Sequence, residues 1–90
     1  MTDIYYIDLS EVQDRETLYE RLFEILPLPE YCGRNLDALY DAFTGEISDS
    51  RVFFTGFDAL EENLSGYGSV FRAMCEEASE ANPTLELFFV

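Results

Sequence analysis

Residues 28–45 read LPEYCGRNLDALYDAFTG, and this stretch joins the signals of a loop to those of a helix. Pro29, like the proline two positions before it, disfavours helical backbone in the residue that precedes it, so the chain is extended there. Gly33 permits a tight turn, Asn35 is a good helix N-cap and Gly45 is a good helix end. The stretch predicts a loop that passes directly into a helix ending near Gly45.

The two faces of this helix differ in character. Apolar residues recur at helical spacing and are predicted to face a core: Leu36, Leu39 and Phe43. The opposite face carries Asp37, Asp41 and Thr44, at i, i+4 and i+7. Two aspartates one turn apart repel by about 0.2–0.5 kcal/mol, and only Asp37 is near enough to the helix start to gain from the helix dipole. Either a functional role explains this local cost, or the helix simply has a solvated acidic face.

The order of residues in this stretch is specific. Its distinctive members are Leu28-Pro29-Glu30-Tyr31, Gly33, Asn35-Leu36-Asp37-Ala38-Leu39, Asp41 and Thr44-Gly45. On these residues the chain resembles the barstar family of intracellular ribonuclease inhibitors. The likeness is weaker elsewhere, although length and order of elements fit over the whole chain. The resemblance implies a single barstar-like domain spanning residues 1–90.

Composition limits the classes of partner. The chain has 90 residues, a net charge of −14, no histidine and five basic residues, all of them arginine. Phosphate contacts require Lys and Arg, so nucleic acid and anionic membranes are disfavoured as direct ligands, and a basic protein partner is favoured. Disordered acidic chains are poor in aromatics, whereas this chain has 8 Phe and 6 Tyr. One folded domain with one core is expected.

The two cysteines indicate a reducing compartment. Cys32 and Cys75 form neither a metal-binding spacing nor a disulfide framework, and they are expected to be free thiols in the cytosol. The N-terminus lacks the basic region of a signal peptide, and no apolar run approaches about 18 residues, so a cytoplasmic protein is expected. Cys32 either is a reactive thiol favoured by the neighbouring Arg34 or fills the place of an aromatic residue. No cofactor and no metal site are predicted.

The remaining chain alternates strands and helices. Three short segments rich in β-formers, apolar on both faces, are predicted as buried strands: Ile4–Ile7, Arg51–Thr55 and Leu85–Val90. Asp14 caps a predicted helix whose buried stripe is Leu18, Leu22, Ile25 and Leu26. A short helix is expected at Phe57, Leu60 and Leu64, closing near Asn63.

A last helix is expected after a flexible segment at 65–69. It buries Val70, Phe71, Met74 and Ala78, exposes Glu76, Glu77 and Glu80, and stops at Asn82-Pro83. Residues 8–13 and 46–50 are expected to be polar connections. Strands separated by helices favour an α/β domain, with a three-stranded parallel sheet, right-handed crossovers and about four helices.

The resemblance assigns roles to individual residues. Asp41 stands in for the substrate phosphate in the cationic cleft of a ribonuclease, and Asp37 together with an acid of the last helix pairs with cations at the rim. Tyr31 supplies a flat aromatic contact, while Gly33 and Asn35 shape the loop. The remaining partner-binding residues are Tyr40, Thr44 and Glu77, with Glu76 as the competitor of Glu77.

Each assignment has a structural alternative. In the alternative, Tyr31 would serve only loop packing, Tyr40 would belong to the core, and Thr44 would be a helix-end residue without a partner contact. The glutamates of the last helix would form a solvated face. The family pattern also differs at Cys32, Arg34 and Tyr40. Arg34 either meets an acid of the partner or pairs with Asp37 or Asp41, and the partner's rim is expected to be less basic than that of the family's usual nuclease.

The resemblance implies an immunity-type inhibitor of a basic, guanyl-preferring ribonuclease, as in a toxin–antitoxin pair, acting as a monomer in a 1:1 complex. A regulatory domain that binds a basic non-nuclease protein is the alternative, followed by an acidic nucleic-acid mimic. An enzyme is disfavoured, because the paired aspartates have no nucleophile, phosphate loop or metal shell beside them. A Ca²⁺ site is disfavoured too, because no calcium-loop pattern is present.

Overall fold

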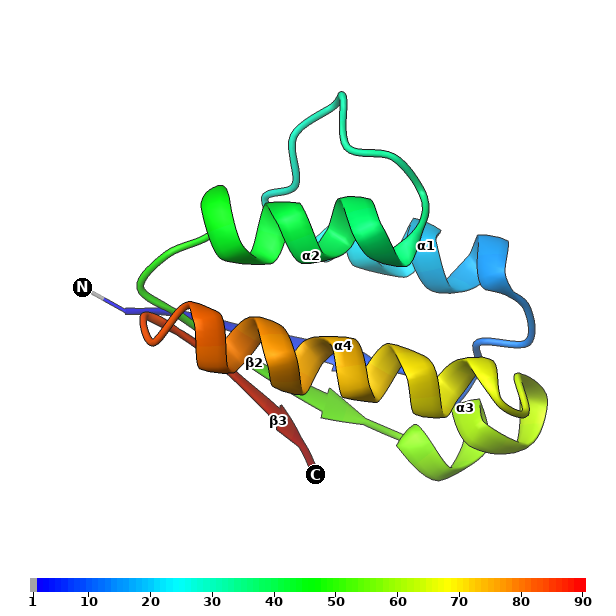
Figure 1. Cartoon of the computed structure of the whole chain (residues 1–90). Helices are drawn as coiled ribbons and strands as arrows, with labels where there is room; N and C mark the ends of the chain where they lie inside the picture. Colours follow the sequence, from blue (N-terminus) through cyan, green and yellow to red (C-terminus); the bar gives the residue numbers. More distant parts are fainter. Residues whose placement is uncertain (1) are drawn as a thin grey trace.

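The computed structural model describes residues 2–90 and consists of three strands and four helices (Figure 1). In chain order they are β1 (Asp3–Asp8), α1 (Arg15–Ile25), α2 (Leu36–Gly45), β2 (Ser50–Thr55), α3 (Phe57–Asn63), α4 (Tyr67–Ala81) and β3 (Leu85–Phe89). The predicted strands and helices are all present, with ends shifted by one to three residues. The longest irregular segment joins α1 to α2 and stands out from the molecule as an arch (Figure 1).

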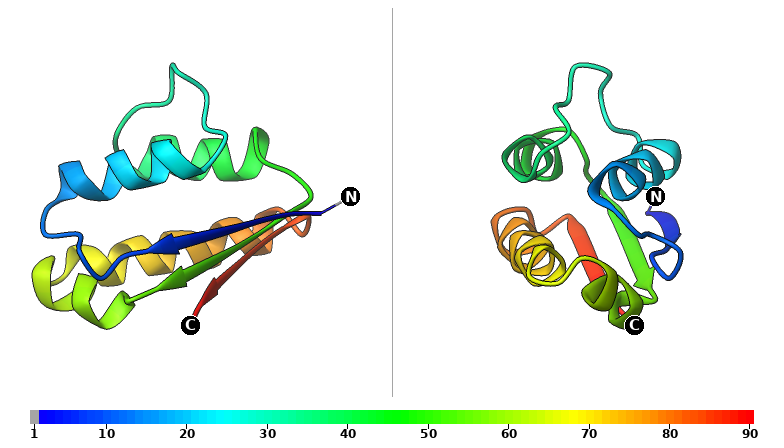
Figure 2. Two further views of the ribbon diagram at one scale, coloured as in Figure 1. Left: turned by 180° about the vertical axis from the view of Figure 1, so that it is seen from behind. Right: turned by 90° about the vertical axis from the view of Figure 1, so that its right-hand side faces the viewer.

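The three strands form one parallel sheet in the order β1-β2-β3. The register places Ile7 beside Phe54, and Phe54 beside Phe89. The helices lie on one side of this sheet, and α2 and α4 run side by side in the same direction (Figure 2). The predicted α/β fold, with a three-stranded parallel sheet and four helices, is confirmed.

The core fills the space between the sheet and the helices. Phe54 lies at its centre, stacked on Phe89 at 4.9 Å between ring centroids and edge-on to Phe71 at 5.6 Å. The predicted inner faces of α1 and α2 are buried there, namely Leu18, Leu22, Leu39 and Phe43. Both predicted N-caps are formed: the Asp14 side chain accepts from the Thr17 amide, and the Asn35 side chain accepts from the Ala38 amide.

The outer face of the sheet is open, which corrects the expectation of strands buried on both faces. Ile4 is 51% exposed, Tyr6 69% and Phe88 37%. Tyr6, Phe53 and Phe88 stack across the three strands, with ring centroids 5.3 Å and 5.0 Å apart. The expectation was wrong because the helices pack on one side only, so apolar residues on the other side cover one another.

Two connections that were predicted to be polar also contribute to the core. Leu9 and Val12, between β1 and α1, are fully buried, and Ile47, between α2 and β2, is almost fully buried. The Asp8 carboxylate accepts from the Ser10 amide and forms a local turn, which directs the two apolar side chains inward. Isolated apolar residues in a loop show no periodicity, so sequence pattern did not reveal their burial.

The last helix begins earlier than predicted, at Tyr67 within the segment expected to be flexible. The Ser69 hydroxyl donates to the Glu61 carboxylate of α3, and a carboxylate at the start of a helix is favoured by the helix dipole. Phe71, Met74 and Ala78 are buried as expected, but Val70 is 54% exposed, so its predicted burial was wrong. Val70 lies about 100° around the helix from Phe71 and about 40° from Met74, so it is at the edge of the buried stripe.

Candidate partner-binding surface

Helix α2 carries four of the eight predicted site residues, and both of its ends are fixed. At the start, Asn35 caps the helix with a hydrogen bond of 2.8 Å to the Ala38 amide. At the end, the side-chain amide of Asn82 donates to the carbonyls of Phe43 and Ile47, each at 2.8 Å. Since Asn82 follows α4, these bonds tie the two helices together and hold α2 in place.

The acidic face of α2 points to solvent. Asp37 and Asp41 are exposed, and no arginine nitrogen of residues 2–90 lies within 4.0 Å of either carboxylate. The Thr44 hydroxyl donates to the carbonyl of Tyr40 at 2.8 Å, within its own helix. The two carboxylates are therefore available to cations of another molecule, whereas the Thr44 hydroxyl is turned to the backbone.

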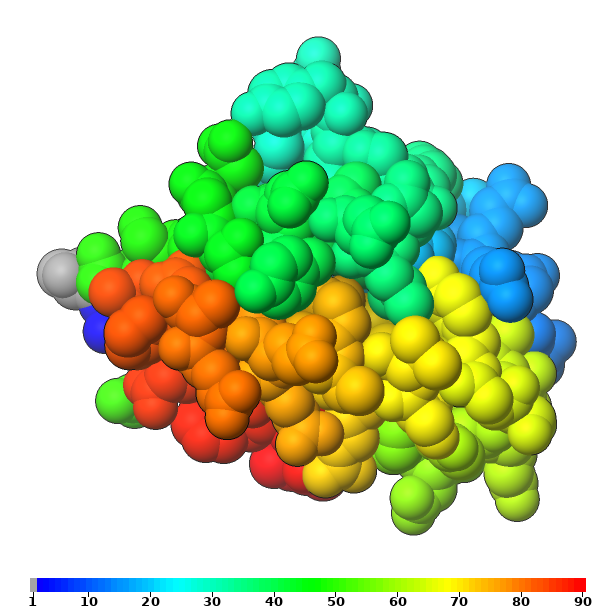
Figure 3. Space-filling view, in the orientation of Figure 1, coloured from blue at the N-terminus to red at the C-terminus, as the bar shows by residue number. Residues whose placement is uncertain are grey.

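The arch between α1 and α2 stands beside this face (Figure 3). Tyr31 is 79% exposed, and its hydroxyl donates to the Glu46 carboxylate at 2.8 Å. This hydrogen bond raises the pKa of Tyr31, because it stabilises the protonated phenol beside a negative charge. It links the arch to the end of α2 and leaves the tyrosine ring facing outward.

Gly33 lies at the point where the arch closely approaches the start of α2. A Cβ at this position would lie 3.0 Å from the Asn35 side-chain nitrogen and 3.4 Å from the Ala38 Cβ. A side chain at position 33 would therefore require the capping side chain of Asn35 to move by a few tenths of an ångström. The arch and α2 enclose a cleft of ≈190 Å³, the loop cleft, lined by Pro29, Tyr31, Cys32, Gly33, Ala38, Asp41, Ala42 and Glu46.

Cys32 is a structural thiol in the arch. Burial and the charge of Asp41 raise its pKa, so of the two alternatives for Cys32 a reactive thiolate favoured by Arg34 is not supported. The Arg34 guanidinium lies instead over the Phe23 ring, 5.1 Å from its centroid. Both cysteines are free thiols, and burial raises the pKa of Cys75 as well.

A second hollow, the α2–α4 groove, lies on the other side of α2. Its volume is ≈430 Å³, and it is lined by Leu36, Asp37, Tyr40, Val70, Ala73, Met74 and Glu77. Glu77 thus shares a groove with Asp37 and Tyr40, whereas the Glu76 carboxylate lies 3.8 Å from the Arg72 side chain. Tyr40 is half-buried, packing against the core while it lines the groove.

The structure distributes the predicted residues over one continuous surface. Tyr31, Gly33 and Asp41 line the loop cleft, while Asp37, Tyr40 and Glu77 line the α2–α4 groove. Asn35 caps α2 and Thr44 lies near its end, but the side chains of both are engaged in backbone hydrogen bonds. Two further residues that line these hollows, Glu46 and Val70, were not predicted as site residues from the sequence. For Val70 the sequence did contain a signal. Its spacing from Met74 and Glu77 (i, i+4, i+7) places the three side chains on one side of α4.

Two kinds of site are not found in the part of the chain that the structure describes. No three His, Cys, Asp or Glu side chains within residues 2–90 are grouped so that they could hold a metal ion. No helix of that range is long and apolar enough to cross a membrane.

A comparison with models of protein families shows to which family the chain belongs. The model of the family described as Barstar (barnase inhibitor) matches residues 2–90, so the match includes α2, the arch and all three strands. The chain belongs to the barstar family. Barstar-family proteins are inhibitors rather than enzymes, so at the level of the family a barnase-inhibitor-like role is supported.

A curated relative agrees with this membership. The chain is 32% identical over 75 residues to the Bacillus subtilis protein named "Putative ribonuclease inhibitor YrdF". The aligned part covers 82% of each chain. The relative and the family description thus name the same kind of protein.

Proposed function

We propose that this protein inhibits a basic, guanyl-preferring ribonuclease by covering its active cleft with α2 and the adjacent arch. The observation that carries the proposal is the pair of exposed aspartates on α2, Asp37 and Asp41, which have no arginine partner within residues 2–90. A ribonuclease binds a polyanion, so its cleft carries cations spaced for phosphates. Carboxylates held on a rigid helix replace those phosphates without themselves being cleaved.

Asp41 is the proposed anchor. It stands at the middle of α2, between the arch and the α2–α4 groove, and lines the loop cleft beside Tyr31. Residues central to an interface are shielded from water by their neighbours, and this strengthens a charge pair. Tyr31 adds a flat aromatic contact at one side of Asp41, and its hydroxyl is already held by Glu46.

The α2–α4 groove is the proposed site for a basic side chain at the rim of the nuclease. Its lining includes the apolar side chains of Leu36, Val70 and Met74 together with the carboxylates of Asp37 and Glu77. A long arginine or lysine side chain has an apolar stem and a charged head, which matches this arrangement. Glu77 is therefore preferred over Glu76, which faces Arg72.

The net charge of −14 supports the same partner class. Opposite charges steer diffusing proteins together and raise association rates to about 10⁸–10⁹ M⁻¹s⁻¹ at low salt, with a steep fall as salt increases. We also propose that the inhibitor acts as a monomer in a 1:1 complex in the cytoplasm, as the immunity partner of a toxic ribonuclease.

The test is ribonuclease inhibition with purified proteins, using barnase and the ribonuclease encoded nearest this gene. The proposal expects stoichiometric inhibition of at least one of them, weakened by added salt. If neither nuclease is bound, a regulatory domain for a basic non-nuclease protein becomes the leading function.

A further inference from the structure

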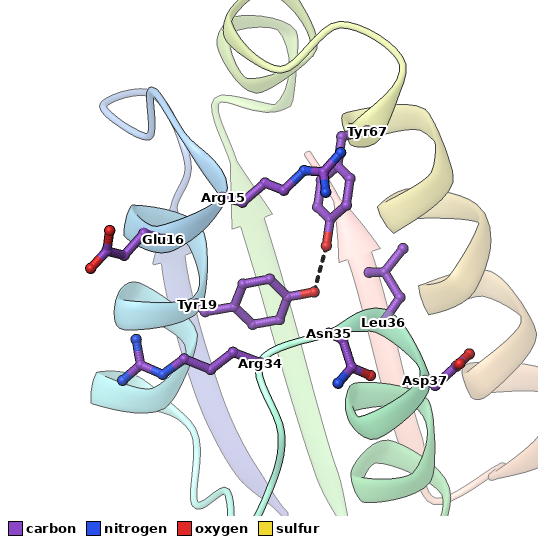
Figure 4. A pocket seen from close by; sticks show the side chains of 8 residues that line it. All are labelled: Arg15, Glu16, Tyr19, Arg34, Asn35, Leu36, Asp37 and Tyr67. Carbon is purple, nitrogen blue, oxygen red and sulfur yellow. Dashed lines mark hydrogen bonds between the residues drawn. The ribbon is translucent and has the colours of Figure 1, made fainter.

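A third and larger hollow, the arginine cleft, lies between α1, the start of α2 and the start of α4 (Figure 4). Its volume is ≈550 Å³, and its lining includes two arginines, Arg15 and Arg34, two acids, Glu16 and Asp37, and the polar side chains of Tyr19, Asn35 and Tyr67. In a chain with 19 acidic and only 5 basic residues, two of the five line this one cleft. The cleft thus differs from the neighbouring acidic face of α2, because its lining has as many basic as acidic side chains.

The two arginines are held by aromatic rings instead of carboxylates. The Arg15 guanidinium carbon lies 4.2 Å from the centroid of Tyr67, and that of Arg34 lies 5.1 Å from the centroid of Phe23. Neither arginine has a carboxylate within 4.0 Å among residues 2–90, whereas Arg51 is paired with Glu86 at 2.9 Å. A ring that lies under a guanidinium positions it and leaves the N–H donors at its edges for another acceptor.

Two tyrosine hydroxyls add a further donor. The hydroxyls of Tyr19 and Tyr67 are hydrogen-bonded at 2.5 Å, so one O–H donates to the other and one hydrogen remains for an external acceptor. Burial of Tyr19 raises its pKa, so it stays a neutral phenol. In Figure 4 the carboxylates of Glu16 and Asp37 point away from these hydroxyls. The Arg34 guanidinium also points away from the hydroxyls, toward α1, whereas Arg15 lies over Tyr67 beside them. The cleft thus has one group of donors formed by Arg15 and the hydroxyls and a separate guanidinium at Arg34, and either can bind a carboxylate.

The arginine cleft adjoins the proposed nuclease-binding surface. Asn35 and Asp37 belong both to the lining of the cleft and to that surface, and Arg34 is the last residue of the arch before the cap of α2. A nuclease seated on α2 and the arch therefore extends over the cleft. Of the roles that the sequence left open for Arg34, pairing with Asp37 or Asp41 is absent from the structure, because no ion pair joins them.

We propose that the arginine cleft receives a carboxylate of the bound ribonuclease, from an Asp or Glu side chain at the rim of its active cleft. This inference rests on the proposed function and names a determinant of partner choice. An acid at that place on a nuclease would be repelled by an inhibitor of net charge −14, unless a local cation meets it. Arg34 and Arg15 thus favour nucleases with an acid at this rim over those that are basic throughout.

The test compares Arg34→Gln and Arg15→Gln with Arg51→Gln, measuring the dissociation constant for barnase and for the ribonuclease encoded nearest this gene. Arg51 lies on the open face of the sheet and is the matched control, because all three variants lose one positive charge. Toward a basic nuclease, the loss of a positive charge by itself strengthens binding. The arginine cleft predicts the opposite sign, with binding weakened about fivefold to tenfold by Arg34→Gln and less by Arg15→Gln.

A second variant set assigns the contact. Arg34→Lys keeps the charge without the planar fork and is expected to recover part of the affinity. Replacing each Asp and Glu at the nuclease rim by its amide is expected to reveal one position at which Arg34→Gln no longer has an effect. If wild type binds neither nuclease, the proposed function fails and the inference with it. If wild type inhibits while Arg34→Gln binds as Arg51→Gln does, the arginine cleft alone is refuted.

Discussion

Replacing Asn82 by alanine tests how firmly the acidic helix is held. The Asn82 side-chain amide donates to the carbonyls of Phe43 and Ile47, and no backbone N–H of residues 2–90 donates to either of them. Phe43 supplies one of the last carbonyls of α2, which have no partner within the helix. Asn82→Ala therefore leaves two backbone acceptors without a protein donor.

The expected loss follows from the number of acceptors left unpaired. A buried polar group deprived of its partner costs about 1–3 kcal/mol, and a net hydrogen bond contributes about 1 kcal/mol. Since Asn82 is half-buried and water can reach part of the site, the low end applies to each of the two carbonyls. We expect a decrease of about 2–3 kcal/mol in the free energy of unfolding, out of the roughly 5–15 kcal/mol typical of a domain.

Urea unfolding followed by circular dichroism measures this difference. Two matched variants separate the donors of Asn82 from its acceptor, because the Asn82 carbonyl also accepts from the hydroxyl of Thr84 at 2.7 Å. Asn82→Asp keeps the acceptor, removes both donors and places a carboxylate oxygen against the two carbonyl oxygens, so it should lose at least as much as Asn82→Ala. Thr84→Val removes only the exposed contact and should lose less than about 1 kcal/mol. A loss below about 0.5 kcal/mol for Asn82→Ala would refute the reasoning.

Three further predictions concern local contacts. Gly56→Ala should lower the free energy of unfolding in urea by more than about 2 kcal/mol, because φ there is +74° and the new Cβ would lie 2.6 Å from the backbone nitrogen of Ser10. The control is Gly45→Ala, where a Cβ would meet nothing within 4 Å, and this variant should be neutral or stabilising. Glu46→Gln should lower the pKa of Tyr31 toward its ordinary value in a ¹³C NMR titration, and an unchanged value would contradict the hydrogen bond. Hydrogen bonds from Thr17 lower the pKa of Asp14, so the stability that this carboxylate contributes is present above pH 3.8 and is lost as pH falls through the lower pKa of the folded state. Asp14→Asn should keep the free energy of unfolding near pH 7 and make that free energy fall less steeply in acid. An equally steep fall would count against the cap.

Local chemistry was enough to predict the elements that carry the site. Asp14 and Asn35 were recognised as N-caps because a short side chain with an acceptor oxygen, placed just before a helical pattern of apolar residues, can accept from the free amides of the first turn. The solvent-facing position of Asp37 and Asp41 followed from helical spacing against Leu39 and Phe43. These features depend on residues within one or two turns, so the sequence contains all the information they need.

Burial that depends on docking between elements was not predictable in this way. Leu9 and Val12 are buried because the β1–α1 connection folds under the helices, and Tyr6 is exposed because no helix covers the outer face of the sheet. Val70 was assigned to the core although it lines the α2–α4 groove, since the rotation of a helix about its axis is set by its neighbours. The choice between Glu76 and Glu77 depends on the same rotation.

Long-range polar contacts were equally inaccessible. The side chain of Asn82 reaches α2 across 39 residues of sequence, and the hydroxyls of Tyr19 and Tyr67 meet across 48. Nothing in the local pattern of an asparagine before a proline, or of a tyrosine within a glycine-rich segment, indicates such a partner. The arginine cleft emerges only when the starts of three helices are brought together by the fold (Figure 4).

The most direct measurement of the central claim is inhibition of the nuclease by wild type, Asp41→Ala and Asp58→Ala, each at low and at high salt. Asp58 is an exposed acid of α3, so its variant has the same change in net charge away from the proposed surface. We expect wild type and Asp58→Ala to inhibit alike, and Asp41→Ala to bind more weakly by about 2–5 kcal/mol, a range drawn from buried interfacial charge pairs that include members of this family. Equal inhibition by all three proteins would contradict the claim that α2 replaces the substrate phosphate through Asp41.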